Sequence, residues 1–190
     1  MPPVLAALFT KLLALDVIND QGQATVGDVV KAADWILANK TKYNIKVANF
    51  SLHSVNRASI LFDPLDQAVE KLWLNGIVVV AAAGNYGSTA GPSGVSFAPG
   101  NDPFVITVGA ADIGTSLGAA DDTAAPFSAY GDTPDGLSNQ DMADPGRYMT
   151  GTVHANTSVT LSGAAQVRAP AEVRQHGNEC EATAVCGGTE

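Results

Sequence analysis

Residues 75–87 read NGIVVVAAAGNYG, and this stretch decides how the rest of the chain is interpreted. Ile77 to Ala83 is an unbroken apolar run, led by β-branched residues and bounded by glycine at both ends. Such a run predicts a strand that is buried on both faces, in the middle of a parallel sheet. Gly84 and Asn85 follow it, so we expect the Asn85 carboxamide in the crevice at the carboxyl end of the strand, where open α/β sheets bind ligands.

Two helix-and-strand units lead up to this strand. The first has apolar residues at helical spacing from Asp28 to Ala38, with Thr25 as a candidate cap, and then a strand from Ile45 to Leu52. The second has a helix that Asp63 caps and Pro64 begins, and it ends at Asn75-Gly76 just before the central strand. Because crossovers between parallel strands are right-handed, both strands should run the same way and end at one edge of the sheet.

Other segments complete the predicted fold. Leu12 to Ile18 is expected to be a short strand, Asn39 to Asn44 a polar connection, and Phe104 to Val108 another buried strand. Trp35 of the first helix is expected in the core, and Trp73 belongs to the apolar stripe of the second helix. The alternation of strands and helices predicts an α/β fold with a three-layer, doubly wound, mainly parallel sheet.

Several segments resemble the subtilisin family of serine peptidases, the subtilases, in the order that the family has them. The resembling segments are VANFSLHS at 47–54, DPLDQAVEKLWLNG at 63–76, AAAGN at 81–85, FAPGNDPFVITVGAAD at 97–112 and DDTAAPFSAYG at 121–131. The resemblance covers roughly Leu12 to Gly163. It implies an incomplete subtilisin-like domain and a serine endopeptidase that acts on polypeptides.

The resemblance also implies a site at the strand ends. In subtilases the asparagine of AAAGN, here Asn85, donates its side-chain NH₂ to the oxyanion of the tetrahedral intermediate. The walls of the primary specificity pocket would be Ser51, Leu52 and His53 on one side, and Ala82, Ala83 and Gly84 on the other. A substrate would pair with the backbone of the first wall as an added strand. Many subtilases have glycine in place of His53, so this imidazole either changes the usual preference for large apolar residues or is an exposed side chain without a role.

The catalytic triad is predicted to be absent. A serine peptidase needs a nucleophilic Ser, a His that takes its proton and an Asp that orients the His. In subtilases the Asp and His lie on segments that precede the region resembled here, and no histidine precedes His53. The nucleophile belongs to a Gly-Thr-Ser-X-Ala pattern, and LSGAA at 161–165 is its best match, with Ala165 where the serine should stand. Ser162 matches the residue ahead of the glycine and is interpreted as a loop serine.

The resemblance stops after Ala165. Gln166 to Glu190 has low hydrophobicity and no helical or strand period, which predicts disorder. We therefore divide the chain into a partial peptidase domain at 1–165 and a divergent tail at 166–190. A reading-frame shift or a decayed gene copy just after Gly163 would produce this pattern.

Composition excludes several classes of function. The chain has 190 residues, is 46% hydrophobic and can bury one sizeable core. Its net charge of −9 and its ten scattered basic residues argue against binding to nucleic acid. It has no apolar run long enough to span a membrane. Lys11 interrupts the apolar opening and no basic residue precedes it, so it does not read as a signal peptide, although the resembling family is mostly secreted or periplasmic.

No metal or cofactor site is predicted. Cys180 and Cys186 form neither a zinc site nor a disulfide framework, and are either locally bridged or free. His154 and His176 have no metal-binding spacing and are interpreted as surface residues. Calcium is implied only by the family resemblance, and no residues are identified for it.

Two other functions stay open. The cleft could hold extended peptides without cutting them, as a non-catalytic binding module. Gly84 and Gly87 after a strand also suggest a nucleotide-binding α/β domain. That second alternative is weaker, because a dinucleotide fingerprint needs three glycines that open a helix, and residues 86–92 read as a loop.

Overall fold

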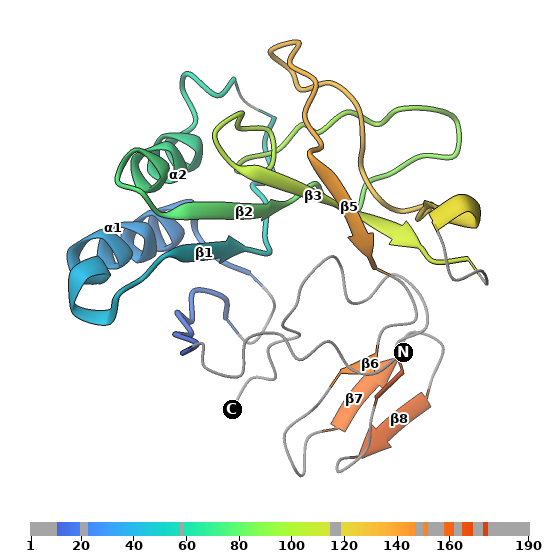
Figure 1. The fold of residues 1–190 in the computed structure, drawn as a ribbon, viewed down its shortest axis with the longest axis horizontal. Coiled ribbons are helices and arrows are strands. Elements are labelled where there is room, and N and C mark those ends of the chain that lie inside the picture. The colour runs from blue at the N-terminus through green and yellow to red at the C-terminus, as the bar shows by residue number, and fades with distance from the viewer. Residues whose placement is uncertain are drawn as a thin grey trace.

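A five-stranded, mostly parallel sheet is the centre of the computed structural model (Figure 1). The structure describes residues 11–19, 23–57, 59–114 and 119–146, and short pieces at 150–151, 158–161, 165–168 and 173–174. The strands of the sheet are β1 (Val47–Phe50), β2 (Val78–Ala82), β3 (Ile106–Asp112), β4 (Thr123–Ala124) and β5 (Met142–Pro145). β1, β2 and β3 are parallel neighbours in that order; β5 pairs with β3 in parallel, and β4 pairs with the end of β3 in antiparallel fashion.

The two helices begin where the sequence predicts. α1 (Val26–Tyr43) is capped by Thr25, whose hydroxyl accepts a hydrogen bond from the Asp28 amide at 3.1 Å. α2 (Pro64–Leu74) is capped by Asp63, whose carboxylate accepts from the Leu65 amide at 2.8 Å. Caps of this kind satisfy amides that have no partner within the helix.

The end of α1 differs from the prediction. The polar run after Ala38 was expected to be a connection, but it continues the helix to Tyr43. Polar residues are compatible with the exposed side of a helix, and Lys40 and Lys42 lie in its last turn, where the helix dipole favours positive charge. Asn44, with φ at 52°, ends the helix in the left-handed conformation that asparagine tolerates.

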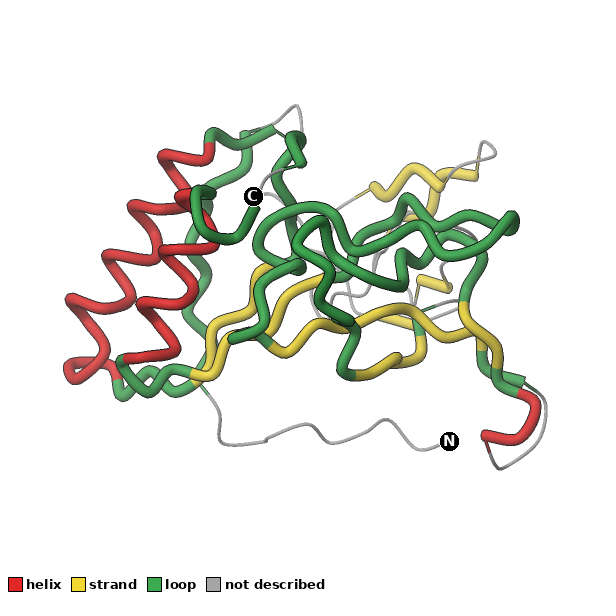
Figure 2. The backbone as a smooth tube through the Cα atoms, turned by 90° about the horizontal axis from the view of Figure 1, so that it is seen from above, coloured by secondary structure: helices red, strands yellow, loops and turns green. Residues whose placement is uncertain are grey.

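Both helices pack on one face of the sheet. Their buried residues share a core cluster with alternate residues of β1 and β2, among them Phe50, Val79 and Ala81. Figure 2 shows the two helices running side by side. On the opposite face, Val47 and Val78 are 57% and 38% exposed. The described residues thus form the sheet and one helical layer of an incomplete α/β fold. The prediction that the central strand is buried on both faces was wrong, because no described helix covers the second face.

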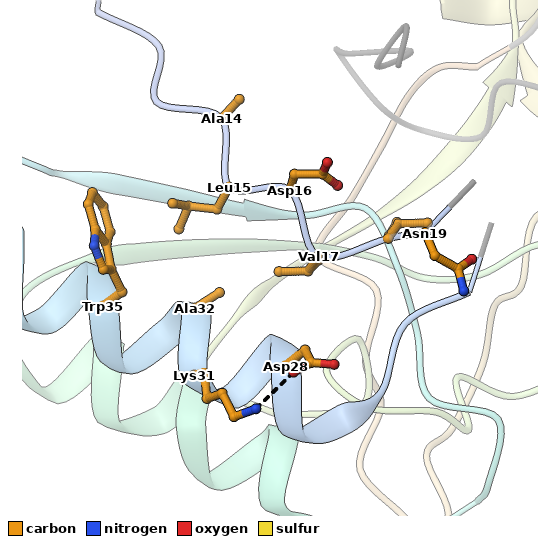
Figure 3. A pocket seen from close by; sticks show the side chains of 10 residues that line it. Ala14, Leu15, Asp16, Val17, Asn19, Asp28, Lys31, Ala32 and Trp35 are labelled. Atoms are coloured by element: carbon orange, nitrogen blue, oxygen red, sulfur yellow. Dashed lines mark hydrogen bonds and ion pairs between the residues drawn. The ribbon is translucent and has the colours of Figure 1, made fainter. Parts of the chain in front are cut away.

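The predicted strand from Leu12 to Ile18 was also wrong. Residues 11–19 run without pairing to the sheet. Val17 packs against the core cluster, and Figure 3 shows Leu15 and Val17 on the side of Ala32 and Trp35 of α1. A shallow pocket lies between this segment and the helix, and it contains none of the predicted site residues.

Neither tryptophan is a core residue. Trp35 is 37% exposed and stacks on Tyr43, with ring centroids 5.7 Å apart, and Trp73 is 38% exposed. Helical spacing places both on the border of the apolar stripe, where a large ring covers surface without leaving solvent.

The remaining regular elements of the described chain are short. They are β6 (Thr150–Gly151), which pairs with β9 (Val173–Arg174), and β7 (Ser158–Leu161), which pairs with β8 (Ala165–Arg168); a 3₁₀ turn, η1, covers Ala119–Asp121. The boundary at 165/166 stays a prediction. Among the described residues, no helix is both long and apolar enough to cross a membrane.

Candidate active-site cleft

The ends of β1 and β2 lie beside one another. Phe50 is paired with Ala81 in the parallel register, and both strands point the same way in Figure 1. The segments that continue them, Ser51 to His53 and Ala82 to Gly84, therefore leave the sheet at the same edge, as predicted. We call these two segments the cleft walls.

Asn85 follows the second wall and has an unused hydrogen-bond donor. Its Nδ2 atom is buried, and no acceptor for it exists among the described residues. A buried donor without a partner costs about 1–3 kcal/mol. Such a cost is typical of a site in which a ligand completes the hydrogen bonding.

The glycine before Asn85 is required by its surroundings. Gly84 has φ at +107°, and a Cβ atom there would lie 2.2 Å from Cε1 of Tyr86. The Tyr86 hydroxyl donates to the Ala83 carbonyl at 3.0 Å and accepts from the Ser96 amide at 2.9 Å. Tyr86 thus fixes the backbone on which Asn85 sits.

An aromatic cluster, which sequence reasoning did not find, connects the two walls. His53 stacks on Phe97 with ring centroids 5.2 Å apart, and Tyr86 meets Phe97 edge-on at 4.8 Å. The Arg57 guanidinium lies 5.9 Å from the centre of the Phe97 ring. His53 is therefore part of a cluster that contacts both walls. His53 is 33 positions from Tyr86 and 44 from Phe97 in the sequence, so a local sequence pattern could not predict their contact.

A loop at 98–102, which we call the rear loop, joins the walls from behind. The Ser54 amide donates to the Ala98 carbonyl at 2.7 Å, and the Ala98 amide donates to the Ser54 hydroxyl at 3.2 Å. On the other side, Gly100 lies so close to β2 that a Cβ atom would be 2.4 Å from the Ala82 carbonyl oxygen. Asn139 donates to the carbonyls of Gly100 and Asp102, at 2.8 and 3.2 Å.

Two carboxyl groups are buried beside the rear loop. Asp66 of α2 and Asp102 are both 0% exposed. Burial, with the neighbouring charges of Asp63 and Asp102, raises the pKa of Asp66 to about 8. Burial, together with Glu70, raises the pKa of Asp102 to about 6. Nothing in the sequence distinguishes Asp66 from a solvent-facing helix residue.

The predicted triad positions are only partly described. Ser162, His154, His176 and both cysteines lie outside the described residues. Ala165 begins β8, which pairs with β7. Within the described residues, no group of three His, Cys, Asp or Glu side chains is arranged to hold a metal ion.

Comparison with known proteins points to one family. The model of the Subtilase family matches residues 6–184. Serine protease AprX of Bacillus subtilis (strain 168) is 34% identical over 141 residues, which are 71% of this chain and 31% of the relative. Subtilisin DY of Bacillus licheniformis is 33% identical over 152 residues, which are 80% of this chain and 47% of the relative.

Solved structures agree. The S41 psychrophilic protease superposes with a TM-score of 0.54 at 25% identity, over 72% of this chain and 43% of that one. Sphericase superposes with a TM-score of 0.57 at 24% identity, over the same shares, and shows the fold alone. The chain therefore spans less than half the length of these relatives.

Proposed function

The chain belongs to the subtilase family of serine peptidases, and from this premise we propose that its cleft walls hold an extended polypeptide, with Asn85 as the oxyanion donor of a subtilisin-like endopeptidase. The observation that carries the proposal is the buried Asn85 Nδ2, which has no acceptor within the described residues. Family membership implies polypeptide substrates. By the same membership we propose a secreted or periplasmic location.

We also propose that these 190 residues, taken alone, do not hydrolyse peptides. Alanine stands at 165, where the resemblance expects the nucleophile, and no histidine precedes His53. A methyl group cannot attack a carbonyl, and without a base no neighbouring hydroxyl is activated. In this form the chain is a peptide-binding module that keeps the oxyanion donor.

A fluorophosphonate probe tests the missing nucleophile. We expect intact-mass spectrometry to show less than about 5% labelling of the folded chain after an incubation that labels an active subtilase to completion, because rapid labelling needs an activated serine. An unfolded protein substrate should likewise stay uncut. Stoichiometric addition of one probe to any serine would overturn the proposal.

Peptide binding tests the cleft. An extended peptide that adds a strand depends on backbone N–H and C=O groups, so His53→Pro, which removes one N–H from the first wall, should weaken binding by about tenfold. His53→Ala is the matched control, because it also deletes the imidazole and its stack on Phe97 but keeps the backbone N–H, so that the difference between the two variants reports the N–H alone. Fluorescence anisotropy with a labelled unstructured peptide library measures both.

Two results would contradict this assignment. If His53→Ala weakens binding as much as His53→Pro, the imidazole and not the strand edge binds the peptide. If no peptide binds and a nucleotide raises the melting temperature instead, the nucleotide-binding alternative replaces the proposal.

A further inference from the structure

Three carboxyl groups converge behind the cleft, and we call them the acid cluster: Asp66 and Glu70 of α2, and Asp102 of the rear loop. Asp66 and Glu70 are one helical turn apart. The charges of Asp102 and Glu70 raise the pKa of Asp66, and Glu70 also raises the pKa of Asp102. Asp66 and Asp102 are completely buried, while Glu70 is partly buried.

The cluster is short of hydrogen-bond partners. Both oxygens of Asp66 and the Oδ2 of Asp102 are buried, and no hydrogen bond of regular geometry reaches them within the described residues, although Asn101 acts on Asp66 and Glu70 acts on Asp102 as hydrogen-bonding neighbours. The other oxygen of Asp102 accepts from the Phe104 amide at 2.7 Å. The Asn101 carboxamide favours the charged form of Asp66, but burial opposes it more strongly. Buried carboxylates with so few donors and no counter-ion among the described residues are costly, so at least one group must be neutral.

Among the described residues, the charges around Asp66 are negative. The titratable groups that act on it are Asp63, the cap of α2, Glu70 of α2 and Asp102 of the rear loop, and all of them are acidic. The described residues also lack three side chains arranged for a metal ion. A proton is therefore the cation that this arrangement accommodates.

The acid cluster is connected to both cleft walls through the rear loop. Asp102 is on α2's side of that loop, and Ala98 at its other end exchanges two hydrogen bonds with Ser54, next to His53. Between them, Gly100 is in close contact with the backbone of Ala82. The rear loop thus contacts the backbone of the second wall at Ala82 and the residue that directly follows the first wall, Ser54.

We propose that a proton shared within the acid cluster fastens the rear loop to α2, and that release of this proton to solvent loosens both cleft walls. The attachment of the rear loop to α2 is argued from the acid cluster itself. The regulation of peptide binding by this proton rests on the proposed function. The cleft is competent when the cluster is protonated, in neutral and mildly acidic solution, and relaxes in mildly alkaline solution.

The direction follows from linkage. Asp66 has a pKa of about 8 in the folded chain, against 3.8 for the reference carboxyl. Between these values the folded state keeps a proton that the unfolded state has released, so stability falls as pH rises and levels off above about 8. The melting temperature of the wild-type chain should therefore fall from pH 5 to pH 8.5.

Hydrogen exchange of the full 190-residue chain tests the anchoring directly, with no peptide present. We compare peptides that contain the Asp102 amide, which donates to the Pro99 carbonyl, and the Ser54 amide, which donates to the Ala98 carbonyl, at pH 5.5, pH 7 and pH 9, with labelling times scaled for the intrinsic exchange rate. In the wild type, protection of both amides should fall at least about tenfold by pH 9. This pH is one unit above the pKa of Asp66, and one pH unit beyond a midpoint corresponds to a tenfold change.

Asp66→Asn keeps the size and removes the titration with a midpoint near pH 8, so between pH 7 and pH 9 protection should change less than about twofold and the melting temperature by less than about 2 °C, while Asp102, with a pKa of about 6, still titrates below pH 7. Asp34→Asn is the matched control, because Asp34 is an exposed acid, paired with Lys71 at 2.9 Å, and should leave the wild-type response intact. Asp102→Asn removes a negative neighbour of Asp66 and should move the midpoint of the transition to lower pH.

Two outcomes would overturn the inference: equal protection of the wild type at all three pH values, or a response between pH 7 and pH 9 that persists in Asp66→Asn. Should Asp66→Asn fail to fold, an unchanged midpoint in Asp102→Asn also overturns it. The proposed function fails separately, if the exchange response is present and peptides bind at none of these pH values.

Discussion

Replacing Asn85 with alanine should lower kcat by ~10²–10³-fold in a chimera in which residues 45–112 of this chain replace the matching segment of an active subtilase. That is the loss that removal of one oxyanion donor causes in a subtilisin. KM should change little, because the carboxamide binds the oxyanion of the transition state more strongly than the carbonyl of the bound substrate. Steady-state kinetics at saturating and limiting substrate separate the two constants.

The structure indicates why this substitution should not disturb the fold. Asn85 Nδ2 has no acceptor among the described residues, so alanine leaves no buried acceptor without its donor. The melting temperature of the chimera should stay within about 2 °C of the parent. Asn85→Asp is the matched control: it keeps the shape, removes the donor and adds negative charge near the oxyanion, so its kcat should fall at least as far. A lower melting temperature together with a raised KM would show instead that Asn85 holds its own loop.

Features that depend on neighbours in sequence were predictable. Thr25 and Asp63 cap their helices because a side-chain oxygen reaches an amide two or three residues ahead. The apolar run before Gly84 became β2, and the crossover rule placed its end beside that of β1. The edge on which Asn85 lies therefore followed from local pattern and handedness alone.

Features that depend on distant contacts were not predictable. The apolar pattern of Leu12 to Ile18 suits a strand, but a strand forms only where an edge is available to pair with it, and here the segment lies against α1. The partial exposure of Trp35 and Trp73 is determined by what covers the border of each helix. A helical period reports which side of a helix is apolar, but not how far the neighbouring elements extend over it.

The acid cluster shows the same limit with a larger consequence. Asp66 lies next to the apolar stripe of α2, and an aspartate there normally faces water. It is buried because the rear loop, more than 30 residues later, packs over it. The contacts that fix the cleft walls, including those of Phe97 with His53 and Tyr86, also come from this later segment. Sequence reasoning thus located the wall residues, whereas the parts that hold them in place required the structure.

The second large effect concerns the core beneath the cleft. Leu72→Ala should reduce the free energy of unfolding by ~2–5 kcal/mol, as leucine truncations in well-packed cores do. Leu72 is 0% exposed and belongs to the cluster that joins α2 to β1 and β2. Alanine removes the apolar atoms that fill this space, and the close packing of the surrounding core prevents full collapse of the cavity. Urea unfolding followed by tryptophan fluorescence and far-ultraviolet circular dichroism measures the change.

Leu74→Ala provides the control on the same helix. Leu74 is 76% exposed, so its truncation deletes an equal volume with little loss of burial. The free energy of unfolding should therefore change by less than about 0.5 kcal/mol. The difference between the two variants isolates burial from helix propensity, since both replace leucine with alanine within α2. Equal effects of the two substitutions would mean that α2 does not pack on the sheet as described. The strands of the cleft walls share that core, so the walls would then lack the support on which the proposed peptide binding depends.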